Sequence, residues 1–519
     1  MTESFPSYFP ASIPDLLLKK AQEQPDKIFL HFRDEEITYR SLLQTVQRVG
    51  TGLGEGGVQQ RDPVALMLRN TPDFLYAYFG VMWRGAVCVP VNTQLKPPEV
   101  GYILRHSEAR VVIVSPEYLG IIEAVRGECP DLQGIVVTGE ATPRGIPWSK
   151  ALSASPMKHS ATLQPSDSAA IIYTSGTTGK PKGVVLTHGN YIFDVHQLVE
   201  TIRMIPQDRF LCILPLFHVN GQVVTILGPL YAGAGMILLE QFSPRDFLAA
   251  LARYKATAFS GVPTVYAILL NLPDADEYDL SSLRFCICGG APMPVEVFER
   301  FEQKFKAFIL EGYGLSEGTC VSSVNPVGGK RKIGSIGLPL RDQEMRILNE
   351  QGKEAAPGDI GEIAIRGRNV MAGYLKDPAA TAEVLKGGWL HTGDLGYWDT
   401  EGYFFIVGRK KEMIIRGGEN IYPKEIEEVL YRHPKVLEAA VIGLPDQIWG
   451  EEVCAFIVLK EGMQGSPEEF IEYCKSRLAD FKCPRKVVFW GQFPKTATGK
   501  IQKGKLKKEY LAKSDGGGA

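Results

Sequence analysis

The sequence predicts an α/β protein with two unequal domains. A large N-terminal domain of parallel sheets flanked by helices, with a β-ribbon or barrel-like part, precedes a small, mobile α+β C-terminal domain. Up to about residue 330, short apolar runs alternate with helical patterns, and strands that are apolar along their whole length are typical of parallel sheets covered by helices on both faces. The 519 residues are 45% apolar and 22% charged, which supports several folded cores.

The expected elements alternate from the beginning of the chain. Strands are predicted at 63–68, 87–91, 110–114, 169–173, 209–214, 235–239, 257–260 and 283–287. Helices are predicted at 73–83, 98–106 and 243–254. In the last of these, Ser243 can cap the helix and proline follows at its first position.

After about residue 330 the pattern changes. Residues 360–367 and 402–407 are typical of antiparallel ribbons, and from Lys424 a compact α+β pattern follows and ends in a lysine-rich helix. We expect the domain boundary near residues 408–411, which divides the chain into domains 1–410 and 411–519.

Charge and cysteine usage exclude several classes of protein. The 57 Lys and Arg residues nearly balance 59 Asp and Glu residues, so the chain lacks the cationic excess of a nucleic-acid binder. Nine cysteines without a C-x-x-C pattern indicate neither a disulfide framework nor a zinc site, which favours a reducing, cytoplasmic location. The N-terminus has no secretory pattern.

One uncharged stretch is long enough to be compared with a membrane-spanning segment. Residues 210–239 hold no Asp, Glu, Lys or Arg, but two prolines and four glycines interrupt them. These interruptions disfavour a membrane-spanning helix, so we expect a buried strand, loop, helix and strand, and no transmembrane segment.

The densest polar cluster is the loop Tyr173–Gly183, directly after an expected buried strand. It contains four Ser or Thr hydroxyls, three glycines and two lysines, which together suit a polyphosphate. The proline that follows Lys180, where a Walker A loop has Ser or Thr, excludes that motif. An ordinary solvent-exposed turn is the alternative interpretation.

This loop resembles the phosphate-binding signature of the adenylate-forming superfamily. The superfamily includes acyl-CoA synthetases, aryl-CoA ligases, luciferases and peptide-synthetase adenylation domains, and the chain is most similar to a medium- or long-chain fatty-acid CoA ligase. Further matching motifs follow in the family's order between about residues 13 and 511. They are 289–293, 311–317, 392–394, 408–423 and 494–500.

The resemblance implies roles for individual residues. The residues implied in ATP or AMP binding are Thr174, Ser175, Gly176, Thr177, Thr178, Lys182, Gly290, Ala291, Pro292, Glu311, Gly312, Tyr313, Gly314, Ser316, Asp394, Arg409 and Lys500. Those implied in binding the acid are His218, Val262 and Gly290, and those implied in binding CoA are Arg416, Gly417 and Gly418. Glu317 and Thr174 are implied in holding Mg²⁺, and Lys411 is implied as a hinge.

Within this set, three residues have more specific implied roles. Tyr313 would stack on adenine, and Asp394 would accept hydrogen bonds from the ribose hydroxyls. Ser316 occupies the position near the α-phosphate where the family usually has threonine.

The chemistry of acid activation explains why cations matter in this pattern. A carboxylate that attacks the α-phosphate of ATP is itself the nucleophile, so the barrier is mostly repulsion between anions. The expected catalytic set is Lys500, Glu317 with Mg²⁺, and His218, assisted by the lysines of the phosphate loop. Lys500 lies in a Thr-Gly turn, whereas the lysines of the following helix are typical of a solvated face.

His218 alone is more typical of a hydrogen-bonded core histidine. The resemblance reverses this interpretation, because many acyl- and aryl-CoA ligases have a histidine beside the acid at the matching place. Peptide-synthetase domains have an aspartate motif for the amino group there, and residues 210–239 contain no aspartate. A buried, unpaired ammonium is costly, so a carboxylic acid without an amino group is favoured.

The glycine loop Arg416–Asn420 suggests a second half-reaction. Adjacent glycines let the backbone approach a ligand closely, as a pantetheine channel requires, although a plain hairpin turn is the alternative. In relatives that transfer the acyl group to CoA, the C-terminal domain rotates about the hinge residue, withdraws the catalytic lysine and presents this loop.

The sequence therefore predicts an AMP-forming acyl-CoA synthetase that uses ATP, CoA and a fatty or other hydrophobic monocarboxylic acid. Three alternatives remain: an enzyme that transfers the adenylate's acyl group to a carrier protein or another acceptor, a non-catalytic nucleotide-binding protein, and a peptide-synthetase module. Chain length stays open between medium and long acids, and the protein is expected to be a monomer or homodimer.

Overall fold

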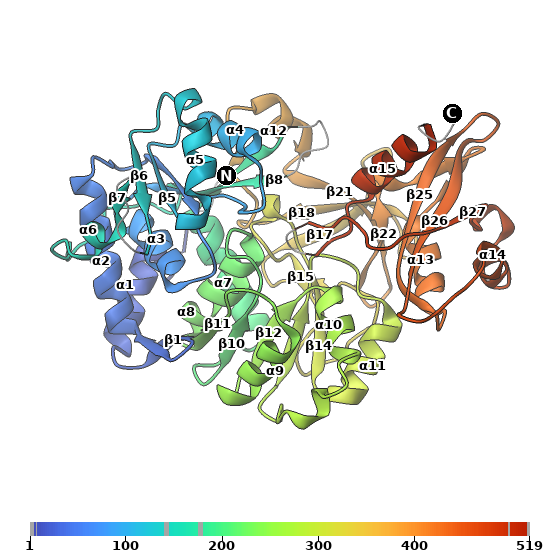
Figure 1. Cartoon of the computed structure of the whole chain (residues 1–519), viewed down its shortest axis with the longest axis horizontal. Helices are drawn as coiled ribbons and strands as arrows, with labels where there is room; N and C mark the ends of the chain where they lie inside the picture. The colour runs from blue at the N-terminus through green and yellow to red at the C-terminus, as the bar shows by residue number, and fades with distance from the viewer. Residues whose placement is uncertain (1–4, 7, 140–144, 175–179, 497–498, 516–519) are drawn as a thin grey trace.

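The computed structural model describes residues 5–6, 8–139, 145–174, 180–496 and 499–515. The described residues form four sheets, and the C-terminal sheet lies at one end of the molecule's longest axis (Figure 1). The predicted α/β class with a small α+β C-terminal part is confirmed. Within the described residues no helix is both long and apolar enough to cross a bilayer.

The first large sheet has the strand order β19-β9-β8-β4-β3-β5-β6-β7. Its strands are β3 (Pro63–Met67), β4 (Val87–Pro90), β5 (Val111–Val114), β6 (Gly134–Val137), β7 (Ile146–Pro147), β8 (Ser168–Thr174), β9 (Lys182–Thr187) and β19 (Gly373–Tyr374). The helices between them are α3 (Pro72–Trp83), α4 (Pro97–Ser107), α5 (Leu119–Val125), α6 (Trp148–Leu152) and the short turns η1 (Pro116–Tyr118) and η2 (Arg126–Glu128).

The second large sheet has the order β16-β15-β14-β13-β12-β10-β11-β1-β2. Its strands are β1 (Ile28–Phe32), β2 (Glu35–Thr38), β10 (Arg209–Cys212), β11 (Gly235–Leu238), β12 (Ala258–Gly261), β13 (Phe285–Cys288), β14 (Phe308–Tyr313), β15 (Ser323–Val324) and β16 (Leu338–Pro339). Its helices are α1 (Ile13–Glu23), α2 (Tyr39–Glu55), α7 (His188–Thr201), α8 (Gly228–Ala232), α9 (Pro244–Arg253), α10 (Pro263–Leu270), α11 (Val295–Phe305), η4 (Ala275–Glu277) and η5 (Ser316–Gly318).

Three apolar cores hold these layers together. One joins a face of each large sheet through α1, α2, α3 and α7, while the outer faces are covered by α4 and α5 on the first sheet and by α9, α10 and α11 on the second. Strands such as β4 and β13 are buried at every residue, which is why their sequences are apolar without alternation. Cys286 and Cys288 lie in β13 as free, buried residues.

The two large sheets are mixed rather than wholly parallel, because five of their strand pairs among the described residues are antiparallel. The central strands are parallel, but β2 pairs antiparallel with β1, and β15 pairs antiparallel with β14. Most importantly, β8 and β9 form an antiparallel hairpin, from Ser168 opposite Thr187 to Thr174 opposite Lys182. The connection between them is too short for a helical crossover, so the two strands can only run in opposite directions.

The stretch 210–239 forms β10, a loop, a helix and β11, as predicted. The helix begins with a π-helical segment, η3 (Gly221–Leu227), and continues as α8. Val223, Ile226 and Leu227 are at most 1% exposed and belong to the central core. The apolar character of this stretch is therefore explained largely by packing.

The third sheet contains only antiparallel pairs, as predicted for this region. Its strands are β17 (Glu344–Leu348), β18 (Gly361–Arg366), β20 (Leu385–Lys386), β21 (Trp389–Trp398) and β22 (Phe404–Arg409), with α12 (Pro378–Val384) and η6 (Lys410–Glu412) beside them. β21 and β22 form a hairpin that ends with Asp394 opposite Arg409.

The fourth sheet begins directly after η6. Its strands are β23 (Ile414–Arg416), β24 (Glu419–Ile421), β25 (Val436–Asp446), β26 (Gly450–Leu459) and β27 (Lys486–Phe489). Its helices are α13 (Pro423–Tyr431), α14 (Pro467–Lys475), η7 (Asp480–Lys482) and α15 (Lys503–Asp515). The sheet packs against α13 and α14 in a core of its own. The boundary at 410/411 stays a prediction.

Candidate active site

The carboxyl ends of three neighbouring strands bring most of the predicted residues to one sheet edge. In the register of β12, β13 and β14, Gly261 lies opposite Cys288, and Cys288 lies opposite Glu311. The residues that follow, Val262, Gly289–Pro292 and Gly312–Tyr313, therefore leave the sheet side by side. This edge is where parallel α/β sheets bind their ligands.

Lys500 reaches this edge from the C-terminal part of the chain. A Cβ added to Gly290 would lie 3.3 Å from Lys500 Cε, and one added to Gly499 would lie 3.2 Å from Val262 Cγ2. The turn that carries Lys500 is closed by Thr496 N–H, which donates to Lys500 O at 2.8 Å, and by Gly499 at φ 83°. Lys500 is thus brought together with Gly290 and Val262.

The Lys500 side chain is exposed overall, but neighbouring protein removes part of its solvation. Loss of solvation lowers the pKa of Lys500, the nearby Arg409 guanidinium lowers it further, and Asp394 opposes the change. Lys500 therefore lies in the same region as Arg409 and Asp394, two of the predicted nucleotide-binding residues. A cation at this place can stabilise charge on an α-phosphate.

His218 lies in the loop after β10. Its Nε2 is buried and has no hydrogen-bond partner among the described residues. Burial lowers the pKa of His218 to about 4, and the charge of Lys500 contributes in the same direction. The imidazole is therefore neutral at pH 7, and its unpaired nitrogen is consistent with the predicted position beside a ligand rather than with a satisfied core histidine.

Asp394 is held by two predicted nucleotide-binding residues. Tyr313 O–H donates to Asp394 Oδ2 at 2.6 Å, and Arg409 Nε lies 2.9 Å from Asp394 Oδ1. Asp394 itself is 4% exposed, and its charge raises the pKa of Arg409. These contacts fix the carboxylate while leaving each oxygen a lone pair for a further donor such as a ribose hydroxyl.

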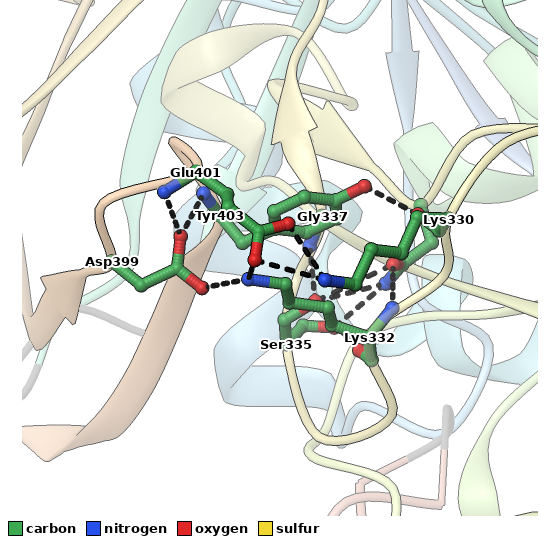
Figure 2. A network of polar contacts seen from close by, with 8 residues as sticks. Lys330, Lys332, Ser335, Gly337, Asp399, Glu401 and Tyr403 are labelled. Atoms are coloured by element: carbon green, nitrogen blue, oxygen red, sulfur yellow. Dashed lines mark hydrogen bonds and ion pairs between the residues drawn. The ribbon is translucent and has the colours of Figure 1, made fainter.

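The far end of the β21–β22 hairpin is clamped by a network of charges (Figure 2). Lys330 Nζ lies 2.8 Å from Glu401 Oε2, and Lys332 pairs with both Asp399 and Glu401. Lys332 also lies 4.7 Å from the centroid of the Tyr403 ring. These contacts fix the loop after β15, which contains Lys330 and Lys332, to the turn of the hairpin. The hairpin that contains Asp394 and Arg409 is therefore linked to the segment that follows β14.

Glu317, in η5, is held by a segment that the sequence did not point to. Tyr374 O–H donates to Glu317 Oε1 at 2.9 Å, and Met371 N–H donates to Glu317 O at 2.8 Å. Asn369 Nδ2 donates to Gly318 O at 3.1 Å. Within the described part of the chain, Glu317 Oε2 has no partner and is available to a ligand.

The side chains present fit Mg²⁺ better than a tightly coordinated transition metal. No group of three or more His, Cys, Asp and Glu side chains suited to a metal occurs among the described residues. Mg²⁺ typically uses one or two carboxylates together with substrate phosphates and water, a requirement that Glu317 with its free oxygen can meet. Thr174 ends β8 at the base of the phosphate loop and would add a hydroxyl.

Glu311 is an unusual buried acid. It is 3% exposed, its Oε1 accepts from Met293 N–H at 3.2 Å, and its Oε2 has no partner among the described residues. Burial raises the pKa of Glu311 to about 7, against the opposing charge of Lys424. Glu311 thus fastens the segment 289–293, which contains Gly290, Ala291 and Pro292, to β14.

Two further predicted positions are explained by the backbone. A Cβ at Gly314 would lie 1.5 Å from Cys320 O, so only glycine fits there. Ser316 begins η5 and is half-buried. Of the phosphate loop, Thr174 and Lys182 are described at the ends of β8 and β9, whereas Ser175, Gly176, Thr177 and Thr178 lie outside the described residues.

The predicted CoA loop contacts different residues. Arg416 Nε lies 2.7 Å from Glu452 Oε1, and its guanidinium lies 4.7 Å from the Trp449 ring centroid. Gly417 N–H donates to Trp449 O at 2.9 Å, and Gly417 and Gly418 have φ values of 58° and 90°. This loop is the turn between β23 and β24. It is thus held by its own domain.

Lys411, the predicted hinge, lies in η6 between the third and fourth sheets. Burial and the neighbouring Arg409 lower its pKa. The position joins two separately built sheets by a three-residue helical turn. Its role as a hinge stays a prediction.

Sequence reasoning missed two residues at this site. Ser260 O–H donates to Asn220 Oδ1 at 3.1 Å, and Asn220 Nδ2 would lie 3.7 Å from a Cβ at Gly289. Asn220 stands two residues after His218, so the position itself was a usable signal. Tyr374 is separated from Glu317 by 57 residues, and no local pattern connects the two.

The fold and this arrangement define the class of protein. The family model of the AMP-binding enzyme matches residues 17–375, and that of the AMP-binding enzyme C-terminal domain matches residues 425–500. The chain belongs to the AMP-binding enzyme family, as the adenylate-forming resemblance predicted.

Several known proteins are similar along nearly the whole chain. A long-chain-fatty-acid–CoA ligase of Bacillus subtilis (strain 168) is 36% identical, with 97% of each chain covered. A sulfoacetate–CoA ligase of Cupriavidus necator is 37% identical, over 95% of this chain and 96% of the relative. The crystal structure of the anthranilate CoA ligase AuaEII with anthranoyl-AMP superposes with a TM-score of 0.92 at 32% identity, covering 98% of this chain and 99% of that one.

Proposed function

We propose that this protein is an AMP-forming acyl-CoA synthetase, which converts a carboxylic acid and ATP to acyl-AMP and pyrophosphate and then transfers the acyl group to CoA with release of AMP. The observation that carries the proposal is the approach of Lys500 to Gly290, in a region shared with His218, Asp394 and Arg409.

The first half-reaction follows from the charges at this edge. Asp394 would orient the ribose, which directs the α-phosphate toward Lys500. The ammonium lowers the repulsion as the acid's carboxylate oxygen attacks the α-phosphorus and pyrophosphate leaves. Mg²⁺ bound to Glu317 and the phosphates would neutralise charge on the departing pyrophosphate.

The second half-reaction requires another set of residues. The CoA thiol, as thiolate, attacks the acyl carbonyl carbon and AMP leaves. In the described arrangement Lys500 lies beside Gly290, while Arg416 pairs with Glu452 and Gly417 N–H donates to Trp449 O. Rotation about Lys411 would exchange the two loops.

For the acid, we propose a hydrophobic monocarboxylate, with fatty acids as the first candidates. The absence of aspartate in residues 210–239 disfavours an amino acid, and buried Val262 adjoins the Lys500 turn. The apolar residues of η3 support this choice less than their composition suggested, because they pack in the core. The similar proteins are named for long-chain, sulfonated and aromatic acids.

A substrate screen tests the proposal. Purified protein is incubated with ATP, Mg²⁺ and acids from acetate to palmitate, together with sulfoacetate and anthranilate, with and without CoA, and AMP and acyl-CoA are quantified. We expect CoA-dependent AMP release that equals thioester formed, greatest with a fatty acid. AMP release without any thioester would favour transfer to another acceptor, and no adenylate with any acid would favour a nucleotide-binding protein.

A further inference from the structure

Tyr374 lies between two residues that the proposed reaction needs. Its hydroxyl donates to Glu317 Oε1 at 2.9 Å, and Lys182 Nζ lies 4.8 Å from the centroid of its ring. One aromatic side chain thus contacts the expected magnesium ligand with its hydroxyl group and a lysine of the phosphate loop with its face.

The backbone of Tyr374 is fixed to the strand that follows the phosphate loop. In the pairing of β19 with β9, Tyr374 lies opposite Val184, and Leu375 N–H donates to Gly183 O at 2.7 Å. Tyr374 N–H donates to Thr381 Oγ1 at 2.8 Å. The ring is half-buried. Because β19 pairs with β9, the strand that contains Lys182 also sets the position of Tyr374.

The preceding residues fix the backbone of Glu317. Met371 N–H donates to Glu317 O at 2.8 Å, and Asn369 Nδ2 donates to Gly318 O at 3.1 Å. Thr319 O–H in turn donates to Asn369 O at 2.5 Å. Residues 369–374 therefore connect β9 to η5, two segments that are more than 120 positions apart in the chain.

The hydroxyl contact determines how Glu317 can act. A carboxylate with one oxygen occupied by a donor keeps its orientation and offers the other oxygen to a cation. A tyrosine phenol carries its proton at neutral pH, so Tyr374 is the donor and Glu317 the acceptor. The acceptor and donor roles are therefore fixed at working pH.

The ring contact has a different character. A lysine over an aromatic face is held only weakly at accessible sites. Such a contact restricts where the ammonium lies, yet is weak enough for a phosphate oxygen to replace it. The ring contact would thus keep the Lys182 ammonium beside the loop that is proposed to receive the triphosphate.

We propose that Tyr374 is a positioning residue for the phosphate end of the site, which orients Glu317 toward the metal ion and holds Lys182 ready for the phosphates of ATP. The proposal rests on the function proposed above and adds a residue to it. Tyr374 contacts neither the acid nor the nucleotide in this account and acts through its two neighbours.

The test measures metal binding without turnover. In a Lys500→Ala background, Mn²⁺ replaces Mg²⁺ as a paramagnetic probe, and its binding to the enzyme–ATP complex is followed by electron paramagnetic resonance. Tyr374→Phe removes only the hydroxyl. We expect its Mn²⁺ dissociation constant to rise about 10-fold, as is usual when a partner of a metal ligand is lost. ATP binding in EDTA should be unchanged.

Tyr374→Leu removes the ring as well. It should show the same loss of Mn²⁺ affinity and, in addition, about 3-fold weaker ATP binding in EDTA, because Lys182 is no longer restricted. The control is Tyr39→Phe, which also loses a buried hydroxyl, one that donates to Ala234 O at 2.6 Å, but lies in α2. It should leave both affinities unchanged.

A double-mutant cycle separates positioning from a general loss of structure. Glu317→Gln alone should weaken Mn²⁺ binding at least as much as Tyr374→Phe, and the two changes together should cause no further loss. Additive losses, or wild-type Mn²⁺ affinity in Tyr374→Phe, would overturn the proposal. Failure of the wild-type protein to bind ATP with Mn²⁺ would instead count against the proposed function.

Discussion

The two loops of the C-terminal part differ in what they touch. The turn with Lys500 leaves its own domain and lies against Gly290 and Val262, whereas the Arg416–Gly418 loop is paired with Glu452 and covered by Trp449. Both loops are expected to act on the same acyl-AMP. The difference supports the proposal that this arrangement serves adenylate formation and that thioester formation uses a second arrangement.

The largest effect is expected when the inserted loop loses its cation. Lys500→Ala should slow acid-dependent exchange of pyrophosphate into ATP by about 10²- to 10³-fold, because the charge at the α-phosphate is lost. Thioester formation from supplied acyl-AMP should fall less than about 3-fold, because that step occurs after the lysine has withdrawn. Rapid-quench assays of both steps provide the measurement, and equal losses in the two would contradict the separation.

A change in the Arg416–Gly418 loop should slow thioester formation and spare adenylate formation. Gly418→Leu introduces a side chain at φ 90°, where no other atom of the described residues lies within 4 Å of an added Cβ. Adenylate formation should therefore change little. Transfer to CoA should slow on the order of 100-fold, because a closely approached channel is obstructed. Gly462→Leu is a matched control, since Gly462 has a φ of 74° and an added Cβ there also meets no atom of the described residues within 4 Å.

A smaller effect is expected at Asp394. Asp394→Asn keeps the shape but weakens the contacts with Arg409, Tyr313 and the ribose. The KM for ATP should rise about 10-fold, because hydrogen bonds to a charged group contribute more than neutral ones. The KM for the acid should stay within a factor of two. Initial rates over a range of ATP concentrations test this, and a change confined to the acid would exclude the ribose role.

The last effect concerns stability rather than rate. The pKa of Glu311 is raised to about 7 in the folded protein, so the folded state holds a proton that the unfolded state has lost between about pH 4.5 and 7. Its contribution therefore falls as the pH rises through this window, by at most about 3 kcal/mol. Glu311→Gln removes this dependence. The thermal midpoint of Glu311→Gln, relative to that of the wild type, should rise as the pH increases from 5 to 8. A difference that does not change with pH would contradict the raised pKa of Glu311.

Much of the fold could be predicted because local patterns carried it. The apolar runs that became β3, β4, β5 and β13 are buried at nearly every residue, so their composition was informative. The direction of β9 was not predictable in the same way, since an apolar run looks alike in a parallel and an antiparallel pair. Only the short connection after β8 contained that information.

The candidate site divides along similar lines. Residues within recognisable motifs, such as Asp394, Arg409 and Lys500, are found near one another. Tyr374 was missed because its contact with Glu317 depends on the pairing of β19 with β9, a long-range feature. The composition of 210–239 was misleading for substrate choice, because apolar residues that line a ligand and those that pack in a core look the same in a sequence.

The most direct test of the two-arrangement account is to lock the Lys500 turn in place. Cysteines at Val262 and Gly499 are suitable, since an added Cβ at Gly499 lies 3.2 Å from Val262 Cγ2 and the nine native cysteines are buried. Each single cysteine variant provides a control for strain. The oxidised double variant should form acyl-AMP but no acyl-CoA, and reduction should restore thioester formation. Acyl-CoA formation at an unchanged rate by the fully oxidised protein would contradict the account.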